Sequence, residues 1–279
     1  MKLKGLDGKD GSEVKLPSQF SEAFRPDMIK RAVLSIQSHK RQPYGAQPGA
    51  GMRASAKLSK RRKSYKTCYD KGIARTPRKI LSARGLNFYW VGAVAPNTVS
   101  GRRAHPPKAE KIWDLKMNRK ERRLAIRSAI AATVDAEKVK ERGHKAESVI
   151  VDTKFEELKK TKEVEDLFLK IGLKAELKRI SVKKVRAGKG KIRNRRYRVK
   201  KGPLIVVSKK CALVDSARNF LGVDVCMVKD LNAELLAPGT HAGRLTIWSQ
   251  GAVEILDKEN LFYERREKWK ILSKLSNTL

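Results

Sequence analysis

Two segments of the chain carry far more positive charge than a packed domain can accommodate. Residues 40–108 hold 17 lysines and arginines against one acid, Asp70, and residues 183–201 hold 11 against none. Together they account for +27 of the formal net charge of +36. Like charges at this density repel one another in a compact state and attract polyanions. We therefore expect two basic excursions from a domain of ordinary charge, with a nucleic acid as the partner.

The first excursion, residues 39–108, also lacks the hydrophobic periodicity of helices and strands. Glycine and proline recur throughout it, and the run 43–59 is dominated by small and polar residues. A segment of this length without secondary structure is uncommon inside a compact domain unless it is functional or disordered. We expect an extended arm that orders only against its partner. Residues 183–201 are expected to form a flexible basic loop.

The remaining segments, residues 1–38 and 109–279, have the pattern of one globular α/β domain. The first residues predict a short hairpin that turns at Asp7-Gly8 or at Asp10-Gly11. Strands and helices alternate after the arm, which indicates a parallel sheet with helices on both faces. The expected strands are 149–151, 204–207, 223–228 and 245–248, and the expected short helices are 212–219, 230–236 and 250–257.

Three longer helices have recognisable starts. One begins at Pro26, and a second follows Asn118, which pairs with Glu121 as a capping box. A third is capped by Thr161 and ends at Gly172. Their apolar residues recur at helical spacing, so each helix has one face for the core.

Composition excludes several classes of protein. The cysteines, Cys68, Cys211 and Cys226, are too few and too scattered for a disulfide framework. The first residues have no apolar signal-peptide core, and the longest aliphatic run, Leu204–Val207, is far too short to span a membrane. We therefore expect a soluble cytoplasmic protein that does not interact with membranes.

Residues 49–54 match the G-x-G-x-x-G/A pattern of a dinucleotide-binding turn, but the context argues against it. Such a turn joins a buried strand to a helix, whereas basic and proline-rich sequence flanks this one. The glycines, with the neighbouring small residues, are expected to let the backbone approach a phosphate-rich surface. Gly188-Lys189-Gly190-Lys191 lacks the spacing of a phosphate-binding loop, so it too is interpreted as basic loop.

No constellation of catalytic or metal-binding residues is visible. The four histidines are far apart, and no cysteine or acid cluster completes a metal site. Asp152 and Asp224 follow or begin expected strands, where α/β enzymes place acids, but neither has a paired base, so structural roles are favoured. We expect neither an enzyme nor a metal site.

Aromatic residues are interleaved with the cations of the arm, at Tyr44, Tyr65, Tyr69 and Phe88–Trp90. Such rings can stack on unpaired bases. Alternatively, Phe88–Val91 forms a small hydrophobic cluster that holds the two limbs of the arm together. The sequence leaves both interpretations open.

The stretch Gly101–Asp135, GRRAHPPKAEKIWDLKMNRKERRLAIRSAIAATVD, closely resembles the archaeal and eukaryotic-type branch of the universal large-subunit ribosomal protein four family. The segments QPYG at 42–45, GMR at 51–53, Thr246–Ala252 and Tyr263–Trp269 are similar to that family too, and the wording GRRAHPPK is of the archaeal type. The resemblance extends over essentially the whole chain, although Lys60–Tyr89 departs from the family pattern.

The resemblance implies a three-layer α/β/α sandwich with a mostly parallel sheet and a long extended basic arm inserted after the first helix. It implies a structural protein of the large ribosomal subunit that binds 23S-type rRNA, supports assembly and uses no cofactor. Neighbouring ribosomal proteins are further partners. The arm tip, expected within Lys60–Arg84, would line the polypeptide exit tunnel and meet the nascent polypeptide.

The residues expected to bind rRNA fall in three groups. In the arm they are Arg53, Lys57, Arg61, Arg62, Arg75, Arg78, Arg84, Arg102, Arg103, His105 and Lys108. On the following helix they are Arg119, Arg122, Arg123 and Arg127. In the basic loop they are Lys189, Lys191, Arg193, Arg195, Arg196 and Arg198.

Two alternatives compete with the ribosomal interpretation. A non-ribosomal RNA-binding protein or RNA chaperone would have the same charge distribution, but it would bind many RNAs with similar affinity. An α/β enzyme would need a nucleotide or substrate site outside the arm.

Overall fold

The computed structural model describes residues 1–85 and 87–263, which divide into two units. Unit 1 comprises residues 1–39 and the chain from residue 114 onward, and unit 2 comprises residues 40–113. Most of the Tyr263–Trp269 segment used for the family resemblance lies outside the described residues. Unit 2 extends beyond the expected boundary at residue 108 because Trp113 stacks on Tyr44 within it.

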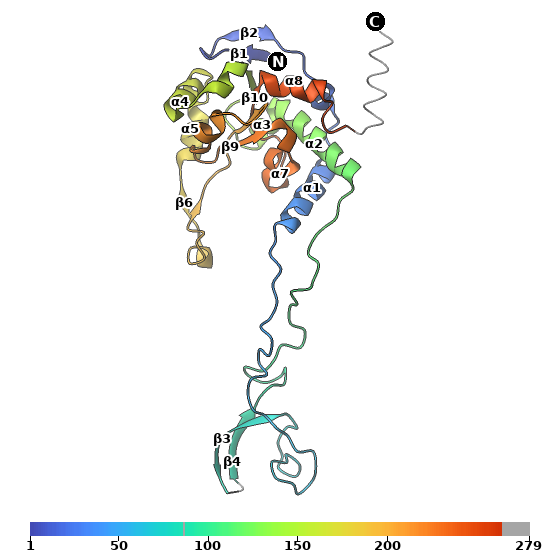
Figure 1. Cartoon of the computed structure of the whole chain (residues 1–279). Helices are drawn as coiled ribbons and strands as arrows, with labels where there is room; N and C mark the ends of the chain where they lie inside the picture. The colour runs from blue at the N-terminus through green and yellow to red at the C-terminus, as the bar shows by residue number, and fades with distance from the viewer. Residues whose placement is uncertain (86, 264–279) are drawn as a thin grey trace. The chain divides into compact units, whose positions relative to one another are not determined.

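Unit 1 is built on a six-stranded sheet in the order β2-β1-β5-β10-β8-β9 (Figure 1). All neighbouring strands are parallel except β1 and β2, which form the antiparallel hairpin at the edge. The fold is therefore α/β with a mostly parallel sheet, as predicted. The strands are β1 (Lys2–Lys4), β2 (Asp10–Glu13), β5 (Val149–Val151), β8 (Leu204–Val207), β9 (Asp224–Met227) and β10 (Thr246–Ser249).

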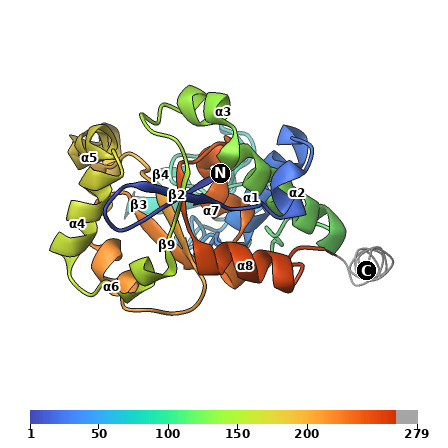
Figure 2. The same cartoon turned by 90° about the horizontal axis from the view of Figure 1, so that it is seen from above.

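Helices cover the sheet on both faces (Figure 2). They are α1 (Pro26–His39), α2 (Arg119–Val134), α3 (Ala136–Glu141), α4 (Thr161–Lys170), α5 (Lys174–Ser181), α6 (Leu213–Arg218), α7 (Ala233–Leu236) and α8 (Gln250–Lys258). Short 3-10 helices lie at Ser18–Ser21, Thr153–Glu157, Gly188–Gly190, Val228–Asp230 and Pro238–Thr240. No helix in the described part of the chain is long and apolar enough to cross a membrane.

The two faces of the sheet bury separate hydrophobic clusters. In β8, Leu204 and Val206 join a cluster with α1, α2, α7 and α8, whereas Ile205 and Val207 join a cluster with α3 to α6. Successive side chains of a strand point to opposite faces, so a strand covered on both sides is apolar throughout. This alternation produces the three layers of unit 1.

Several local predictions need correction. The edge hairpin turns at Asp7-Gly8, and the alternative at Asp10-Gly11 is wrong because both residues lie in β2. Asn118 precedes α2, but its side chain makes no capping hydrogen bond. Thr161 is the first residue of α4 rather than its cap, because Lys160 holds that position and its backbone N–H donates to Glu163.

Two serine hydroxyls of α1 bind the backbone of the chain where it returns toward α2, and we call this contact the hydroxyl clamp. The Ser35 hydroxyl donates to the carbonyl of Leu115 at 2.6 Å, and the amide of Leu115 donates to the Ser38 hydroxyl at 2.9 Å. These three residues of unit 1 therefore hold together the two points at which the chain leaves for unit 2 and returns from it.

Both basic segments contain secondary structure, contrary to expectation. In unit 2, β3 (Arg78–Arg84) pairs antiparallel with β4 (Asn87–Gly92) (Figure 1). In residues 183–201, β6 (Lys184–Val185) pairs with β7 (Tyr197–Arg198). Local pairing needs only short segments, and the flanking cations do not prevent it because their side chains stay in solvent.

Candidate nucleic-acid interface

The predicted contact residues of unit 2 lie mainly at its surface. Exposed members are Arg53, Lys57, Arg61, Arg62, Arg75, Arg84, Arg102, Arg103, His105 and Lys108. Arg78 differs because it is half-buried, with its guanidinium over Trp90 and donating to the carbonyl of Ala74 at 3.2 Å. Arg78 therefore contributes to the packing of unit 2, and the exposed cations form the candidate interface.

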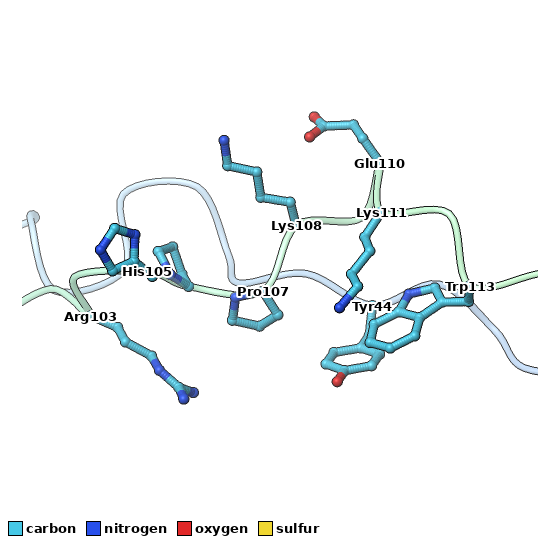
Figure 3. Close-up of a pocket in the computed structure, with 9 residues that line it drawn as sticks. Tyr44, Arg103, His105, Pro107, Lys108, Glu110, Lys111 and Trp113 are labelled. Atoms are coloured by element: carbon cyan, nitrogen blue, oxygen red, sulfur yellow. The ribbon is translucent and has the colours of Figure 1, made fainter.

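Three of these residues meet at one cavity of about 620 Å³ within unit 2 (Figure 3). Arg103, His105 and Lys108 line it, together with Tyr44, Pro106, Pro107, Glu110, Lys111 and Trp113. The rings of Tyr44 and Trp113 stack with centroids 5.2 Å apart and an interplanar angle of 20°. Cations therefore line this cavity together with an aromatic stack, an arrangement that the sequence did not predict.

The walls of this cavity come from two segments that are distant in sequence. The amide of Ala46 donates to the carbonyl of Pro107 at 2.9 Å. A Cβ atom on Gly45 would lie 2.8 Å from the nitrogen of Ala109, so only glycine permits this approach. Gly45 thus lets the two segments run side by side.

Of the two glycines in the apparent dinucleotide motif, only Gly51 also permits a close approach of two backbone segments. Residues 48–52 form turns without a following helix, so the strand–turn–helix context of a dinucleotide site is lacking there. Gly51 has φ of +75°, and a Cβ on it would overlap the backbone of Gly101 and Arg102. Gly51 therefore packs against the chain itself, which corrects its expected role at a phosphate surface. Gly49, also at positive φ, faces open space.

The aromatic residues of the arm divide between the two interpretations. The ring centroid of Phe88 lies 5.2 Å from that of Tyr65, which it contacts edge-on, and 5.7 Å from that of Trp90. These contacts favour a local hydrophobic cluster for the three rings. Tyr89 points away and is 66% exposed. Tyr69 is covered by the guanidinium of Arg75 at 4.6 Å. Tyr89, Tyr65 and Tyr44 are the tyrosine rings of the arm most open to a partner's bases.

On α2, the four predicted arginines have different environments. Arg119 and Arg122 are exposed, whereas Arg123 is half-buried and donates to the carbonyl of Tyr263 at 3.2 Å. Arg127 is buried, pairs with Glu22 at 2.6 Å and donates to the carbonyl of Phe262. Residue 127 lies on the inward face of α2, and we leave Arg127 out of the candidate interface.

The basic loop presents all of its predicted contact residues to solvent. Lys189, Lys191, Arg193, Arg195, Arg196 and Arg198 are exposed, and the guanidinium of Arg196 lies 5.6 Å from the ring centroid of Tyr197. The two-residue strands β6 and β7 hold the ends of this loop together. The loop therefore offers a cluster of cations at the surface of unit 1.

Sequence analysis missed a basic groove of about 900 Å³ in unit 1 beside this loop. Arg142, Arg179, Lys184, Arg198 and Lys200 contribute cations to it. Burial, with the positive charges of Arg244 and Arg179, lowers the pKa of Arg142 to about 10. These residues come from separate elements, so no local sequence pattern could have found the groove.

A hydrogen-bonded triad lies at the wall of this groove. Glu176, fully buried, accepts hydrogen bonds from Arg179 and lies 2.7 Å from Nδ1 of His144. Burial alone would raise the pKa of Glu176, but the hydrogen bonds from Arg179 and His144 outweigh it and lower the pKa to about 2. The triad fixes the position of Arg179 at the groove.

The two aspartates considered as catalytic acids have structural partners. Asp224 pairs with the fully buried Arg244 at 2.7 Å and with Lys201 at 2.9 Å. Asp152 accepts a hydrogen bond from the hydroxyl of Thr153. Over residues 1–85 and 87–263, no group of three or more histidines, cysteines or acids is placed to hold a metal ion.

Comparison with known proteins agrees with the sequence resemblance. The model of the "Ribosomal protein L4/L1 family" matches residues 14–259. The large ribosomal subunit protein uL4 of Nanoarchaeum equitans is 51% identical over 265 residues, covering 94% of this chain and 98% of that protein. The uL4 protein of Archaeoglobus fulgidus is 46% identical, covering 91% and 97%. That of Methanosphaera stadtmanae is 43% identical, covering 94% and 96%. Matched over both units and over nearly the full length of these relatives, the chain belongs to the ribosomal protein L4/L1 family.

Proposed function

We propose that the chain is a structural component of the large ribosomal subunit in the cytoplasm and binds 23S-type rRNA through unit 2 and the basic loop. The observation that carries this proposal is the surface of unit 2, where exposed cations face solvent with almost no acid among them. Relatives named as large ribosomal subunit proteins support the same assignment. The family to which the chain belongs consists of structural ribosomal proteins, so we assign it no enzymatic activity.

The mechanism follows from the chemistry of the phosphate backbone. Each lysine or arginine that neutralises a phosphate releases a condensed counterion, which favours binding and makes it dependent on salt. Arginine can also contact a phosphate with two donors or stack on a base. Unit 2 would order further against folded rRNA and thereby support assembly of the subunit.

A salt titration tests the phosphate contacts. Replacing both Arg102 and Arg103 with alanine should lower the slope of log affinity for large-subunit rRNA against log salt by about 1.4–1.8, or roughly 0.7–0.9 for each contact. The matched control, Lys159→Ala with Lys162→Ala, removes the same charge from exposed positions near α4. An unchanged slope in the Arg102/Arg103 variant would refute their role.

Sedimentation distinguishes the ribosomal role from a general RNA chaperone. A ribosomal protein should remain with large subunits in a sucrose gradient at high salt, whereas a chaperone should be released from them. Competition by unrelated structured RNAs at equal affinity would favour the chaperone.

We further propose that the segment Lys60–Arg84 reaches the polypeptide exit tunnel and that unit 1 contacts neighbouring ribosomal proteins. Photo-crosslinkers placed at exposed positions of this segment should react with a stalled nascent polypeptide. Crosslinkers on α4 should not. Reaction from α4 alone would place the tunnel contact elsewhere.

A further inference from the structure

We propose that the cavity beside Tyr44 binds one unpaired RNA nucleotide, with its base stacked on the Tyr44 ring and its phosphates held by Arg103 and Lys111 (Figure 3). This inference rests on the proposed RNA-binding function and adds to it a specific mode of recognition. Contacts to phosphates position a protein, whereas contacts to bases discriminate between nucleic-acid structures.

Both rings of the aromatic stack contact cations, and Tyr44 is the more exposed of the two. The guanidinium of Arg41 lies 3.9 Å from the ring centroid of Trp113 and 5.3 Å from that of Tyr44, and it donates a hydrogen bond to the Tyr44 hydroxyl. The ammonium of Lys111 lies 4.4 Å from the ring centroid of Trp113. Tyr44, stacked on Trp113, remains 47% exposed and lines the cavity. Trp113 therefore supports Tyr44 from behind, and Tyr44 offers a flat apolar surface on which a base can stack.

The cations are arranged beside this surface. In Figure 3, Arg103 and Lys111 extend to the side of the chain on which Tyr44 lies, while the carboxylate of Glu110 extends to the other side. The cavity of about 620 Å³ is in the size range of small-ligand sites, roughly 300–1,000 Å³. A flat ring with flanking cations fits a nucleotide better than an acidic peptide, whose carboxylates would leave the ring uncovered.

The cavity is also held in shape without a ligand. The hydrogen bond from Ala46 to Pro107 and the close approach of Gly45 to Ala109 fix the two segments that carry Tyr44 and Arg103. A preformed site loses less conformational entropy on binding than a flexible one. Gly45 is therefore a positioning residue for the pocket.

Two oligonucleotides separate base recognition from phosphate binding. The full chain should bind an adenosine hexamer at least about tenfold more tightly than the corresponding abasic ribose-phosphate hexamer. Tyr44→Leu should abolish this preference while leaving the salt slope unchanged. Tyr89→Leu, which removes an exposed ring outside the cavity, should retain the preference.

Two further variants distinguish loss of the pocket from misfolding of the chain. Arg103→Gln leaves both rings in place and should weaken both hexamers alike, with a salt slope lower by about 0.7. Gly45→Ala removes no contact group, yet should reduce the preference for the adenosine hexamer by separating the two segments. Adenosine monophosphate at the concentration of the hexamer should not displace it, because a free nucleotide lacks the neighbouring phosphates.

The possible failures are distinct. Salt-dependent binding of both hexamers with equal affinity would overturn the nucleotide pocket and leave the rRNA-binding proposal standing. Equal losses in Tyr44→Leu and Tyr89→Leu would also overturn it, since stacking would then be general. Displacement by the monophosphate would overturn the proposal that the cavity recognises a nucleotide within an RNA chain. Absence of salt-dependent binding to any RNA would refute both proposals.

Discussion

Unit 1 and unit 2 are stabilised by different means. Unit 1 buries two large hydrophobic clusters on the faces of its sheet. Within the described part of unit 2, Cys68 and Ala93 are the hydrophobic residues that are buried. Unit 2 is otherwise held by the β3–β4 pairing, aromatic pairs, cation–π contacts and close backbone approaches at glycine. Unit 1 thus has the core of an independent domain, whereas unit 2 has a local conformation with little buried apolar surface and many exposed cations.

The residues that stabilise the fold and the residues proposed to bind RNA lie mainly in different units. Hydrophobic burial is the dominant stabilising contribution in a domain, and unit 1 has nearly all of it. Unit 2 exposes cations that would oppose folding alone and that become favourable against phosphates. Changes in unit 2 should therefore alter RNA binding, and changes in unit 1 should alter folding.

Removing residues 45–105 is the strongest test of this separation. Joining Tyr44 to Pro106 is geometrically reasonable because their neighbours Ala46 and Pro107 are hydrogen-bonded. Unit 1 should still unfold cooperatively, with stability changed by no more than about 0.5 kcal/mol. The salt slope for rRNA should fall by roughly 0.7–0.9 for each lost contact. Calorimetry and filter binding measure the two effects. A loss of cooperative unfolding would show that unit 1 depends on unit 2 for its stability.

Within unit 1, Glu176→Gln should be strongly destabilising. It removes a fully buried charge and leaves Arg179 and His144 without their partner. Breaking a buried ion pair in this way costs about 3–5 kcal/mol. Urea denaturation measures the loss, and a change below about 1 kcal/mol would show that the triad adds little to the unit.

The same residue predicts a dependence on pH. The pKa of Glu176 is lowered from 4.5 to about 2 in the folded protein, so its contribution is fully present above pH 4.5. It is lost as the pH falls from 4.5 toward 2, because the unfolded state then binds the proton first. Stability curves of the wild type and Glu176→Gln should converge over this range. Parallel curves would contradict the assignment.

Two glycines of unit 2 test whether close backbone approach stabilises its local conformation. Gly51→Ala combines a positive φ with overlap onto the backbone of Arg102, whereas Gly49→Ala meets only the φ penalty. Gly49→Ala should cost about 1 kcal/mol and Gly51→Ala distinctly more. Hydrogen exchange at the amide of Arg102, which donates to Val94, reports the local effect. Similar exchange in both variants would mean that the close approach at Gly51 is unimportant.

The smallest expected effect concerns helix caps in unit 1. The side chain of Asp135 accepts hydrogen bonds from the amides of Glu137 and Lys138 at the start of α3. Asp135→Ala should therefore cost about 1 kcal/mol. Asn118→Ala should cost less, because Asn118 makes no such bond. Thermal denaturation of both variants tests the difference, and a reversed order would contradict the described caps.

Much of unit 1 could be predicted because its strands are buried on both faces. Val149–Val151 and Leu204–Val207 are strands with the predicted bounds, since a short apolar run between polar turns has few alternatives. The caps were less predictable, as Thr161 and Asn118 show, because neighbouring backbone geometry decides which residue accepts the bond. Helix α5 was missed because it is short and its apolar face includes few residues.

For the candidate interface, the charge pattern predicted which residues are exposed, whereas no signal in the sequence indicated how those residues are arranged. Exposure of residues such as Arg53 and Arg103 follows from the cost of burying a charge. The burial of Arg127 depends on Glu22, which is distant in sequence and gives no local signal. The same holds for the contribution of Trp113 to the cavity beside Tyr44. The family resemblance itself was confirmed by the match over residues 14–259.

The hydroxyl clamp between α1 and Leu115 has a consequence for how this fold can vary. Once the ends of an inserted segment are joined, the entropy of closing it grows only with the logarithm of its length, by about 0.6 kcal/mol for each doubling. Ser35 and Ser38 perform that closure inside unit 1. A change in the length of the insert should therefore cost unit 1 little stability.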